Sequence, residues 1–271
     1  MPLGGKLVVI TGGSSGIGKQ LAADFLRRGA RTVIVSRDPA RLKQSANDLA
    51  AIAPLVDVVT CDVGDAESVG RMGKEVLARF GCPDILVNNA GFATYRTFEQ
   101  MELEEIEELA SVNFLGALRC TKVFLGTMVS RRSGAIVNIA SIAGRIPMTP
   151  NGTYSASKHA LVAWSETLRY EVARFGLSVS VICPGRVETS FFDHATFRER
   201  LARREMRQNV PLDQVSRATF DAIARRRFLT YVPTSLGLMV WAANSLPFVV
   251  KPFYRRLMQR RVSDLYARSS R

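Results

Sequence analysis

Short apolar runs rich in β-branched residues alternate with longer segments over the first 190 residues. The longer segments carry apolar residues at helical spacing, as Leu21, Phe25 and Leu26 do. Near-continuous apolar strands separated by helices are typical of a parallel sheet that is covered on both faces. We therefore predict strands at Lys6–Thr11, Thr32–Ser36, Val56–Thr60, Asp84–Asn88, Ala135–Ile139, Leu177–Ile182 and Phe228–Val232.

The segments between these runs predict helices, the longest of them over Leu103–Met128 and Tyr154–Phe175. Because crossovers between parallel strands are right-handed, such a chain predicts an α/β fold: a doubly wound, Rossmann-type sheet of about seven strands. No internal repeat or low-complexity linker divides it. We expect a catalytic domain over residues 1–233 and a basic, partly hydrophobic helical extension over residues 234–271.

A glycine-rich turn follows the first predicted strand and precedes a predicted helix. Residues 11–18 read TGGSSGIG. Glycines let the backbone approach a pyrophosphate, and the helix N-terminus presents free N–H groups to it. The turn therefore predicts a dinucleotide site that includes Gly12, Ser14, Ser15, Gly16, Ile17 and Gly18.

The spacing G-x-x-x-G-x-G, with the motifs that follow it in order, resembles the short-chain dehydrogenases/reductases over roughly residues 5–233. The further motifs are Asp62-Val63, the NNAG segment at 88–91, Ser141 with Tyr154-x-x-x-Lys158, and the PGxxxT segment at 184–189. The resemblance implies that Asp62-Val63 contacts the adenine ring and that the NNAG segment supports the sheet and the cofactor. It also implies that Ser141, Tyr154 and Lys158 catalyse the reaction and that the PGxxxT segment borders the nicotinamide. The additional cofactor residues so implied are Asp62, Val63, Asn89, Ala90, Gly91, Tyr154, Lys158, Pro184, Gly185, Val187 and Thr189.

The predicted catalytic residues also make chemical sense by themselves. Tyr154 and Lys158 are four residues apart, so they share one face of a helix. A nearby ammonium should lower the pKa of the Tyr154 phenol from its usual value of about 10, giving an acid/base group near neutral pH. Ser141, at the end of the fifth strand, can hydrogen-bond a carbonyl oxygen.

Asn113 is a poor helix former within an otherwise helical run. It is either a capping or polar surface residue, or a catalytic one. The resemblance implies the second role, in which Asn113 belongs to a water-mediated proton path to Lys158. All core motifs of the family are present, which favours an active enzyme.

The residues at the end of the second strand indicate which cofactor is bound. NAD-specific sites place a carboxylate there, whereas an arginine accommodates the 2′-phosphate of NADP(H). This chain has Ser36 and Arg37, which favours NADP(H). Asp38 is expected to cap the helix that begins at Pro39. Lys19 either adds charge to the site or is a solvated helix residue.

The expected substrate side is apolar. In the resembled family the segment after PGxxxT covers the substrate, so we predict a lid over residues 191–227, or otherwise one packed helix face. Only Arg96 and Arg145 are candidates for binding a substrate carboxylate. We therefore expect a small lipophilic carbonyl or alcohol substrate, such as a long-chain keto lipid or a steroid. The apolar residues are Phe92, Tyr95, Phe98, Ile146, Pro147, Met148, Phe191, Phe192, Phe197, Leu201, Met206 and Val210.

The positive charge is concentrated in the last quarter of the chain. Residues 1–195 contain 21 Lys+Arg and 19 Asp+Glu, whereas residues 196–271 contain 16 and 5. Residues 228–250 are uncharged, and a basic segment follows. This order suits an anionic membrane surface, although Asn244 and Pro247 disfavour a transmembrane helix. The alternative is a tail that packs on the body or on a partner subunit.

Taken together, the sequence predicts an NADPH-dependent carbonyl reductase, or the reverse alcohol dehydrogenase. The tail and the turn at 11–19 are similar to those of membrane-associated reductases of the family, including reductases of 3-ketosphinganine and steroids. A non-catalytic NADP(H)-binding module and a peripheral membrane protein remain alternatives. Without a recognition-helix pattern we expect no nucleic-acid partner.

The remaining expectations concern assembly, location and metal. The resemblance implies a homodimer or homotetramer. We expect a cytoplasmic protein, free or peripheral on a membrane, because residues 1–13 lack a charged segment followed by an apolar core of the kind found in a signal peptide. The four cysteines and two histidines are too scattered to predict a metal site or a disulfide framework.

Overall fold

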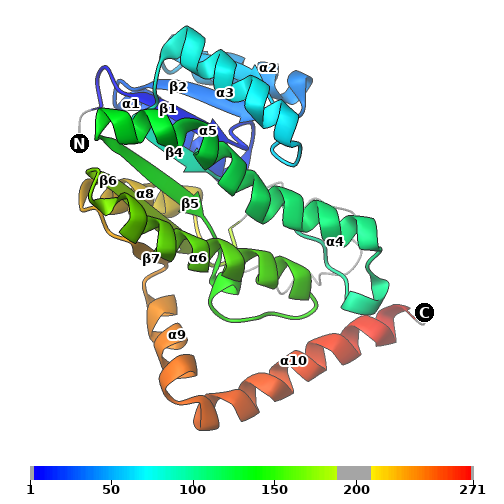
Figure 1. The fold of residues 1–271 in the computed structure, drawn as a ribbon. Coiled ribbons are helices and arrows are strands. Elements are labelled where there is room, and N and C mark those ends of the chain that lie inside the picture. The colour runs from blue at the N-terminus through cyan, green and yellow to red at the C-terminus, as the bar shows by residue number, and fades with distance from the viewer. Residues whose placement is uncertain (1–2, 188–208, 270–271) are drawn as a thin grey trace.

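The computed structural model describes residues 3–187 and 209–269. Their centre is a seven-stranded, all-parallel sheet with the strand order β3-β2-β1-β4-β5-β6-β7, which confirms the predicted Rossmann-type architecture (Figure 1). The strands are β1 (Leu7–Thr11), β2 (Arg31–Ser36), β3 (Val56–Thr60), β4 (Ile85–Asn88), β5 (Gly134–Ile139), β6 (Leu177–Pro184) and β7 (Leu229–Val232).

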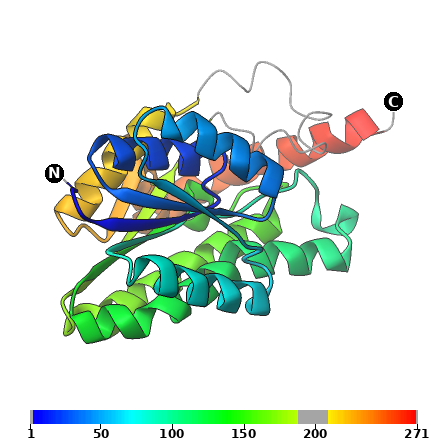
Figure 2. The same ribbon diagram turned by 90° about the horizontal axis from the view of Figure 1, so that it is seen from above.

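Helices cover both faces of the sheet, as Figures 1 and 2 show. One face carries α1 (Gly16–Arg27), α2 (Pro39–Ala50) and α8 (Leu212–Ala224), and the other carries α3 (Ala66–Phe80), α5 (Gly116–Arg131) and α6 (Gly152–Ala173). The remaining helical segments are η1 (Phe98–Gln100), α4 (Leu103–Ala110), η2 (Ser111–Leu115), η3 (Ile142–Gly144), α9 (Ser235–Ser245) and α10 (Pro247–Ser269).

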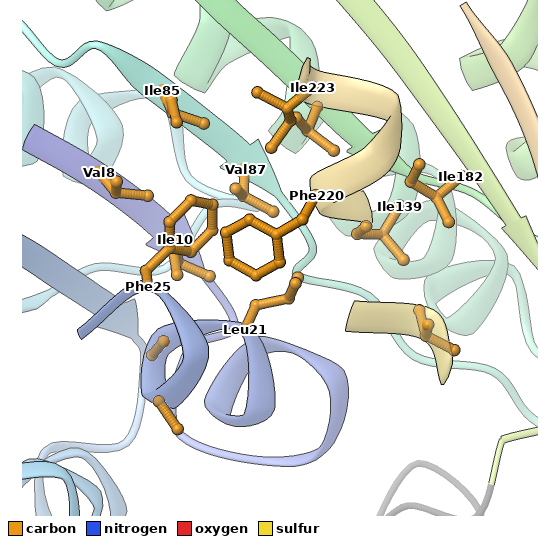
Figure 3. Packing of buried hydrophobic residues seen from close by; sticks show 14 of the residues in the cluster. Val8, Ile10, Leu21, Phe25, Ile85, Val87, Ile139, Ile182, Phe220 and Ile223 are labelled. Carbon is orange, nitrogen blue, oxygen red and sulfur yellow. The ribbon is translucent and has the colours of Figure 1, made fainter. Parts of the chain in front are cut away.

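The strand residues alternate between two hydrophobic cores. In β1, Val8 and Ile10 face α1 and α8, whereas Val9 faces the other layer. Figure 3 shows the first core, where the rings of Phe25 in α1 and Phe220 in α8 lie 4.5 Å apart, centroid to centroid. The central strands therefore bury side chains on both faces, which is why their runs are mostly apolar, whereas the edge strand β3 fully buries only Val59.

The strand order reverses between β1 and β4. The chain moves outward through β2 and β3, then returns to the other side of β1 and continues through β4 to β7. The carboxyl ends of β1 and β4 consequently diverge at a topological switch point, where doubly wound folds bind their ligands. This edge of the sheet is where the glycine turn and the NNAG segment lie.

The helix predicted over Leu103–Met128 is helical throughout in the structure, but it is not α-helical along its whole length. A π-helical turn at Ser111–Leu115 separates α4 from α5. The guanidinium of Arg119 supports the widened turn by donating to the Gly64 carbonyl oxygen and to the Ser111 hydroxyl, at 2.9 Å each. Such π-turns often occur at functional sites, and this one contains Asn113.

Part of the predicted lid belongs to the core instead. Within residues 191–227, the described portion begins at Asn209, and α8 packs Val215, Phe220 and Ile223 into the hydrophobic cluster around α1. Helix α8 is therefore a covering helix of the sheet. Phe191, Phe192, Phe197, Leu201 and Met206 lie outside the described residues.

After β7 the chain forms two helices that leave the sheet. Figure 1 shows α9 and α10 as a V below the body, with the turn between them at the bottom of the view. By length and composition alone, the described helical stretch Leu103–Arg131 is apolar enough to cross a membrane, but 44% of its apolar window is buried in the fold. Helices α9 and α10 are long and apolar enough to cross a membrane only when they are taken together, and the pair is bent by 111°.

Candidate active site

The glycine turn after β1 is held tightly by neighbouring backbone. Gly12 has φ +64° and Gly16 has φ +51°, a conformation that favours glycine. A Cβ on Gly18 would lie 2.3 Å from the Gly12 carbonyl oxygen. These three glycines thus meet the needs of the turn and of its packing against α1, beyond leaving room for a ligand.

Asn89 supports this turn from the neighbouring strand. Its side-chain Nδ2 donates to the carbonyl oxygens of Thr11 at 3.0 Å and Gly12 at 3.1 Å. In return, the Thr11 hydroxyl accepts the backbone N–H groups of Asn89 and Ala90. The hydroxyl of Thr11 is a positioning group that the sequence analysis did not single out; its place as the first residue of the TGxxxGxG motif was the available signal.

The turn presents unsatisfied donors at the start of α1. Ser15 is the N-cap, and its side chain makes no capping hydrogen bond. The first-turn N–H groups of α1 therefore face the edge of the sheet without a side-chain acceptor, which suits an anionic phosphate.

Ser141, Tyr154 and Lys158 meet at the carboxyl ends of β5 and β6. The Ser141 hydroxyl and the Tyr154 phenol are hydrogen-bonded. Lys158 Nζ lies 5.9 Å from the Tyr154 ring centroid and donates to the Ile139 carbonyl oxygen at 3.0 Å. Ser141 follows β5 by two residues and caps the short helix η3, accepting the Ala143 N–H at 3.1 Å, so it does not end the strand as predicted.

Burial shifts the pKa values of both Tyr154 and Lys158. Desolvation raises the pKa of Tyr154 to about 12, although the Ser141 hydrogen bond opposes the rise. Desolvation also lowers the pKa of Lys158 to about 8. The expectation that the Lys158 ammonium would lower the pKa of the phenol is therefore wrong for this structure, because the desolvation effect is larger. Tyr154 carries its proton at neutral pH.

Asn113 bridges the loop after β4 and helix α6. Its Oδ1 accepts the Phe92 N–H at 2.9 Å, and its Nδ2 donates to the Phe92 carbonyl oxygen at 2.8 Å and to the Ser157 hydroxyl at 3.4 Å. A Cβ on Gly91 would approach Asn113 Oδ1 to 2.8 Å and Lys158 Nζ to 3.4 Å. Asn113 is thus a buried positioning residue beside Lys158, and the surface alternative is wrong.

At the nucleotide end, Ser14 in the glycine turn donates to Ser36 at the end of β2, with the two hydroxyl oxygens 3.0 Å apart. Arg37 is exposed and forms a 3.0 Å ion pair with Glu108 of α4. The sequence analysis missed Glu108, since a partner 71 residues away leaves no local signal. Asp38 caps α2 as predicted.

Lys19 forms an ion pair with Asp48 of α2 at 2.6 Å. The Lys19 ammonium therefore interacts with a carboxylate of α2.

The predicted adenine pair, Asp62 and Val63, comes soon after β3 ends at Thr60. Asp62 Oδ1 accepts the Gly64 N–H at 2.8 Å, and Val63 is buried against Gly116. Beside them lies an acidic cavity of about 370 Å³, lined by Asp62, Gly64, Asp65, Glu104, Glu107, Glu108, Ser111 and Val112.

The segment after β6 is described only as far as Val187. Pro184 ends the strand, and the Gly185 N–H donates to the Val232 carbonyl oxygen at 2.8 Å. Val187 is buried and pairs with Val210 in an isolated β-bridge. Thr189 lies outside the described residues.

The loop after Ser141 packs against the C-terminal tail. Ile146 and Met148 form a hydrophobic cluster with Val240 of α9 and Tyr254 of α10, and the Tyr254 hydroxyl donates to the Pro147 carbonyl oxygen. The tail therefore contacts the body next to the catalytic serine. Of the other predicted lining residues, Phe92 is half-buried and Phe98 is 76% exposed.

The two candidate anion-binding arginines are engaged by the protein itself. Arg96 pairs with Glu105 at 2.8 Å. Arg145 hydrogen-bonds the phenol of Tyr231 in β7. Among residues 3–187 and 209–269, no three His, Cys, Asp or Glu side chains are grouped to hold a metal ion.

This geometry defines a nucleotide-binding oxidoreductase site, and comparisons with known proteins agree. The family model for short chain dehydrogenases matches residues 6–199, more than half of the chain. The chain belongs to the short-chain dehydrogenase/reductase family. The chain is similar to the ketoacyl reductase HetN of a Nostoc species, with 36% identity over 68% of this chain and 64% of HetN. Mouse dehydrogenase/reductase SDR family member 7B is 32% identical over 82% of this chain and 71% of its own length.

Solved structures share the fold and carry nicotinamide cofactors. An actinorhodin polyketide ketoreductase with NADPH has a TM-score of 0.79 and 29% identity, covering 86% of this chain and 97% of that one. A Burkholderia phymatum short chain dehydrogenase with NAD has a TM-score of 0.82 and 27% identity, covering 90% and 95%. The chain spans 64% or less of the length of the first curated relatives it matches. A nicotinamide cofactor fits the glycine-rich turn and the uncapped start of α1.

Proposed function

We propose that this protein is an NADPH-dependent reductase of lipophilic ketones, or the reverse alcohol dehydrogenase. The observation that carries the proposal is the cluster of Ser141, Tyr154 and Lys158 at the sheet edge, next to the glycine turn. Oxidoreductase chemistry on a C=O or CH–OH group follows from the family. The cofactor preference and the substrate class are the proposed parts.

The side chains have distinct tasks in this reaction. The bound nicotinamide supplies or accepts a hydride. Ser141 donates a hydrogen bond to the substrate carbonyl oxygen and so orients it. Tyr154 holds a proton at neutral pH, because burial raises its pKa to about 12, and transfers that proton to the oxygen as the alcohol forms.

Lys158 completes the proton transfer. When Tyr154 gives up its proton, the charge of Lys158 stabilises the phenolate that forms. Asn113 holds the Gly91–Phe92 backbone and Ser157 around this lysine, so it positions the loop against α6. We expect a water-mediated proton path to begin at this point.

Arg37 supports a preference for NADPH. Its guanidinium is exposed at the end of β2, next to the Ser14–Ser36 pair, and a planar fork of this kind suits a 2′-phosphate. Ser36 is uncharged, so it does not repel the 2′-phosphate. Structures similar to this chain contain NAD in one case and NADPH in others, so the preference depends on this chain's own residues.

The local residues favour an apolar substrate. The charge of Arg96 is matched by Glu105, so this arginine is not available to a substrate carboxylate, whereas Arg145 is hydrogen-bonded to the uncharged phenol of Tyr231. The loop after Ser141 is lined by Ile146 and Met148. HetN and the actinorhodin enzyme are named as reductases of ketoacyl and polyketide substrates, respectively, which supports a carbonyl on a long carbon chain.

A turnover screen tests the proposal. We would measure oxidation of NADPH and of NADH with ketones of graded chain length, together with steroid and sphingoid ketones. We expect turnover to rise with chain length and to be faster with NADPH. Turnover restricted to short, charged ketones would contradict the substrate class, and no turnover with any carbonyl would favour the non-catalytic alternative.

We also propose a homo-oligomer, a dimer or a tetramer, that works in the cytoplasm or on a membrane facing it. Assembly is typical of the family. Leu103 of α4 is 64% exposed and Leu115 beside α5 is 38% exposed, and a partner subunit would cover such side chains. Light scattering of the purified full chain checks the assembly: a monomer mass across micromolar concentrations would contradict it.

A further inference from the structure

Helix α10 has one face against the body. Tyr254, Met258 and Leu265 follow one another at helical spacing, and Met258 and Leu265 are 9% and 4% exposed. Tyr254 donates to the Pro147 carbonyl oxygen, and the Thr149 hydroxyl contacts the Met258 carbonyl oxygen at 3.4 Å. The helix is therefore seated in a defined rotation, which also fixes what its opposite face displays.

The opposite face joins apolar and basic side chains. Val249, Phe253, Arg256 and Arg260 recur at intervals of four, three and four residues, so they lie on one side of the helix. All four are exposed, Val249 by 60% and Phe253 by 70%. The apolar pair lies toward the turn with α9 and the basic pair lies farther along the helix.

The turn between α9 and α10 extends the apolar part. Phe248 is 93% exposed, Leu238 is 69% exposed and Trp241 is 59% exposed. Figure 1 shows this turn as the lower point of the V, away from the helices that cover the sheet. A projecting tip of aromatic and aliphatic side chains is costly in water and suits the interface of a lipid bilayer, where tryptophan is enriched. We call Leu238, Trp241, Phe248, Val249 and Phe253 the apolar tip.

The charge around the apolar tip is of one sign. Residues 222–263 contain no aspartate or glutamate. Lys251, Arg255, Arg256 and Arg260 are exposed, and none of them forms an ion pair with another residue in the described part of the chain. Most other exposed arginines of the body have a carboxylate partner, as Arg71 and Arg217 do. Unmatched basic residues also occur singly on the described part of the body, such as Lys43 and Lys74, but in the tail they are grouped beside exposed apolar side chains, which complements an anionic surface.

We propose that the apolar tip inserts shallowly into an anionic membrane surface while the four basic side chains contact the lipid headgroups. This surface is distinct from the catalytic cluster and does not depend on the proposed reaction. The 111° bend keeps the helices at the interface, because α9, with 11 residues, is too short to span the bilayer and the 23 residues of α10 include too many charges. Each basic residue near an anionic surface strengthens binding about fivefold.

Because the tail helices lie beside the active site, membrane binding would also affect access of a substrate. The same two helices contact the loop after Ser141 through Val240, which packs on Ile146, and through Tyr254. A membrane held at the apolar tip therefore lies on the side of the molecule where the tail meets this loop. A ketone that partitions into the bilayer would be concentrated on that side.

Vesicle co-sedimentation of the full-length protein tests the proposal. We expect binding to phosphatidylserine/phosphatidylcholine vesicles (3:7), weak binding to phosphatidylcholine alone, and release as salt is raised. Phe248→Ser with Phe253→Ser should reduce binding at least tenfold. Arg256→Gln with Arg260→Gln should reduce it by more than tenfold and remove the preference for the anionic lipid.

Matched controls keep the test specific. Lys43→Gln with Lys74→Gln removes the same charge from exposed positions on α2 and α3, and it should leave binding within twofold of wild type. Tyr170→Ser removes an exposed aromatic ring from α6 and should do the same. Circular dichroism of each variant verifies that it is folded.

Three results would overturn the proposal. The first is no sedimentation of the wild type with anionic vesicles at low salt. The second is an equal loss of binding in the Lys43/Lys74 control, which would mean that net charge alone binds lipid. The third is a Phe248/Phe253 variant that keeps lipid binding but changes from an oligomer to a monomer, because the apolar tip would then be a contact between copies of this chain.

Discussion

The carboxyl edge of the sheet and the C-terminal helices differ in the burial and pairing of their side chains. At the sheet edge, both ends of the Asn113 side chain are hydrogen-bonded, Asn89 Nδ2 donates to two carbonyl oxygens, and Lys158 is buried with a carbonyl partner. In the tail, Phe248 is almost fully exposed and Arg256 has no acidic partner within the described residues. The side chains named at the sheet edge are paired within the protein, whereas the tail displays groups that a further surface would stabilise.

This difference indicates where each function lies. Positioned, desolvated groups suit chemistry that needs fixed distances and shifted pKa values, and the sheet edge supplies them. Unmatched charge and exposed apolar surface suit association, which does not need a preformed site. The loop after Ser141 joins the two regions, since it carries the catalytic serine at one end and packs on the tail at the other.

The largest effect should come from Tyr154→Phe, which keeps the ring and its packing but removes the proton donor. We expect cofactor binding to survive and kcat to fall by about 10²–10⁴-fold, the usual contribution of a general acid. Steady-state kinetics with a ketone from the turnover screen, together with cofactor titration by fluorescence, measure both properties.

Tyr170→Phe is the matched control for this variant. Tyr170 lies on the same helix, is 63% exposed and is bonded to Arg169 on the surface. Loss of the Tyr170 hydroxyl should leave kcat unchanged. If Tyr154→Phe kept more than about a tenth of the wild-type kcat, the assignment of chemistry to the sheet edge would fail.

The next largest effect should follow from Arg37→Ala. Charge-assisted hydrogen bonds contribute roughly 1.5–3 kcal/mol, so the preference for NADPH over NADH should fall by about 10- to 100-fold. Arg71→Ala removes an equally exposed guanidinium from α3 and should leave the ratio of kcat/KM for the two cofactors unchanged. A wild-type enzyme that uses NADH and NADPH equally would contradict the role of Arg37.

A smaller effect, on stability, is expected for Gly18→Ala. The new Cβ would meet the Gly12 carbonyl oxygen at 2.3 Å, and backbone must move to accommodate it. We expect the free energy of unfolding to fall by about 1–3 kcal/mol in urea denaturation. Gly70→Ala in α3 meets nothing within 4 Å and should be neutral or slightly stabilising. Similar values for both variants would mean that the turn is not tightly packed.

The smallest effect should come from Glu108→Gln. Glu108 holds Arg37 at 3.0 Å and adds negative charge beside the nucleotide end. Its neutralisation should release Arg37 and tighten NADPH binding by up to about fivefold, the range expected for an exposed ion pair, with NADH unaffected. Glu107→Gln, in the same cavity, is the control. Equal effects of both variants on both cofactors would indicate general electrostatics instead of a specific pair.

The sheet could be predicted from the sequence because the central strands are buried on both faces, so their apolar runs stand out. The seven predicted strands agree with the structure to within two residues at each end. The interruption of α4 and α5 at Asn113 could not be predicted, since a π-helical turn depends on distant groups such as Arg119 and Gly64. Asn113 alone hinted at it, as a residue unsuited to a helix.

For the site, spacing predicted which side chains meet but not their electrostatics. Tyr154 and Lys158 share a helix face, as their separation implies, yet the depth of burial reverses the expected pKa of the tyrosine. Long-range partners also lay beyond the sequence, among them Glu108 for Arg37 and Tyr231 for Arg145. The assignment of roles to the individual residues stays a prediction.

The most direct test of the central claim follows the hydride itself. A ketone identified in the turnover screen would be reduced with NADPH that carries deuterium on C4 of the nicotinamide, with each C4 diastereomer in turn. We predict that one diastereomer transfers its deuterium to the carbinol carbon of the alcohol, and that Tyr154→Phe slows this transfer at least a hundredfold. An alcohol that contains no deuterium with either diastereomer would contradict hydride transfer at this site.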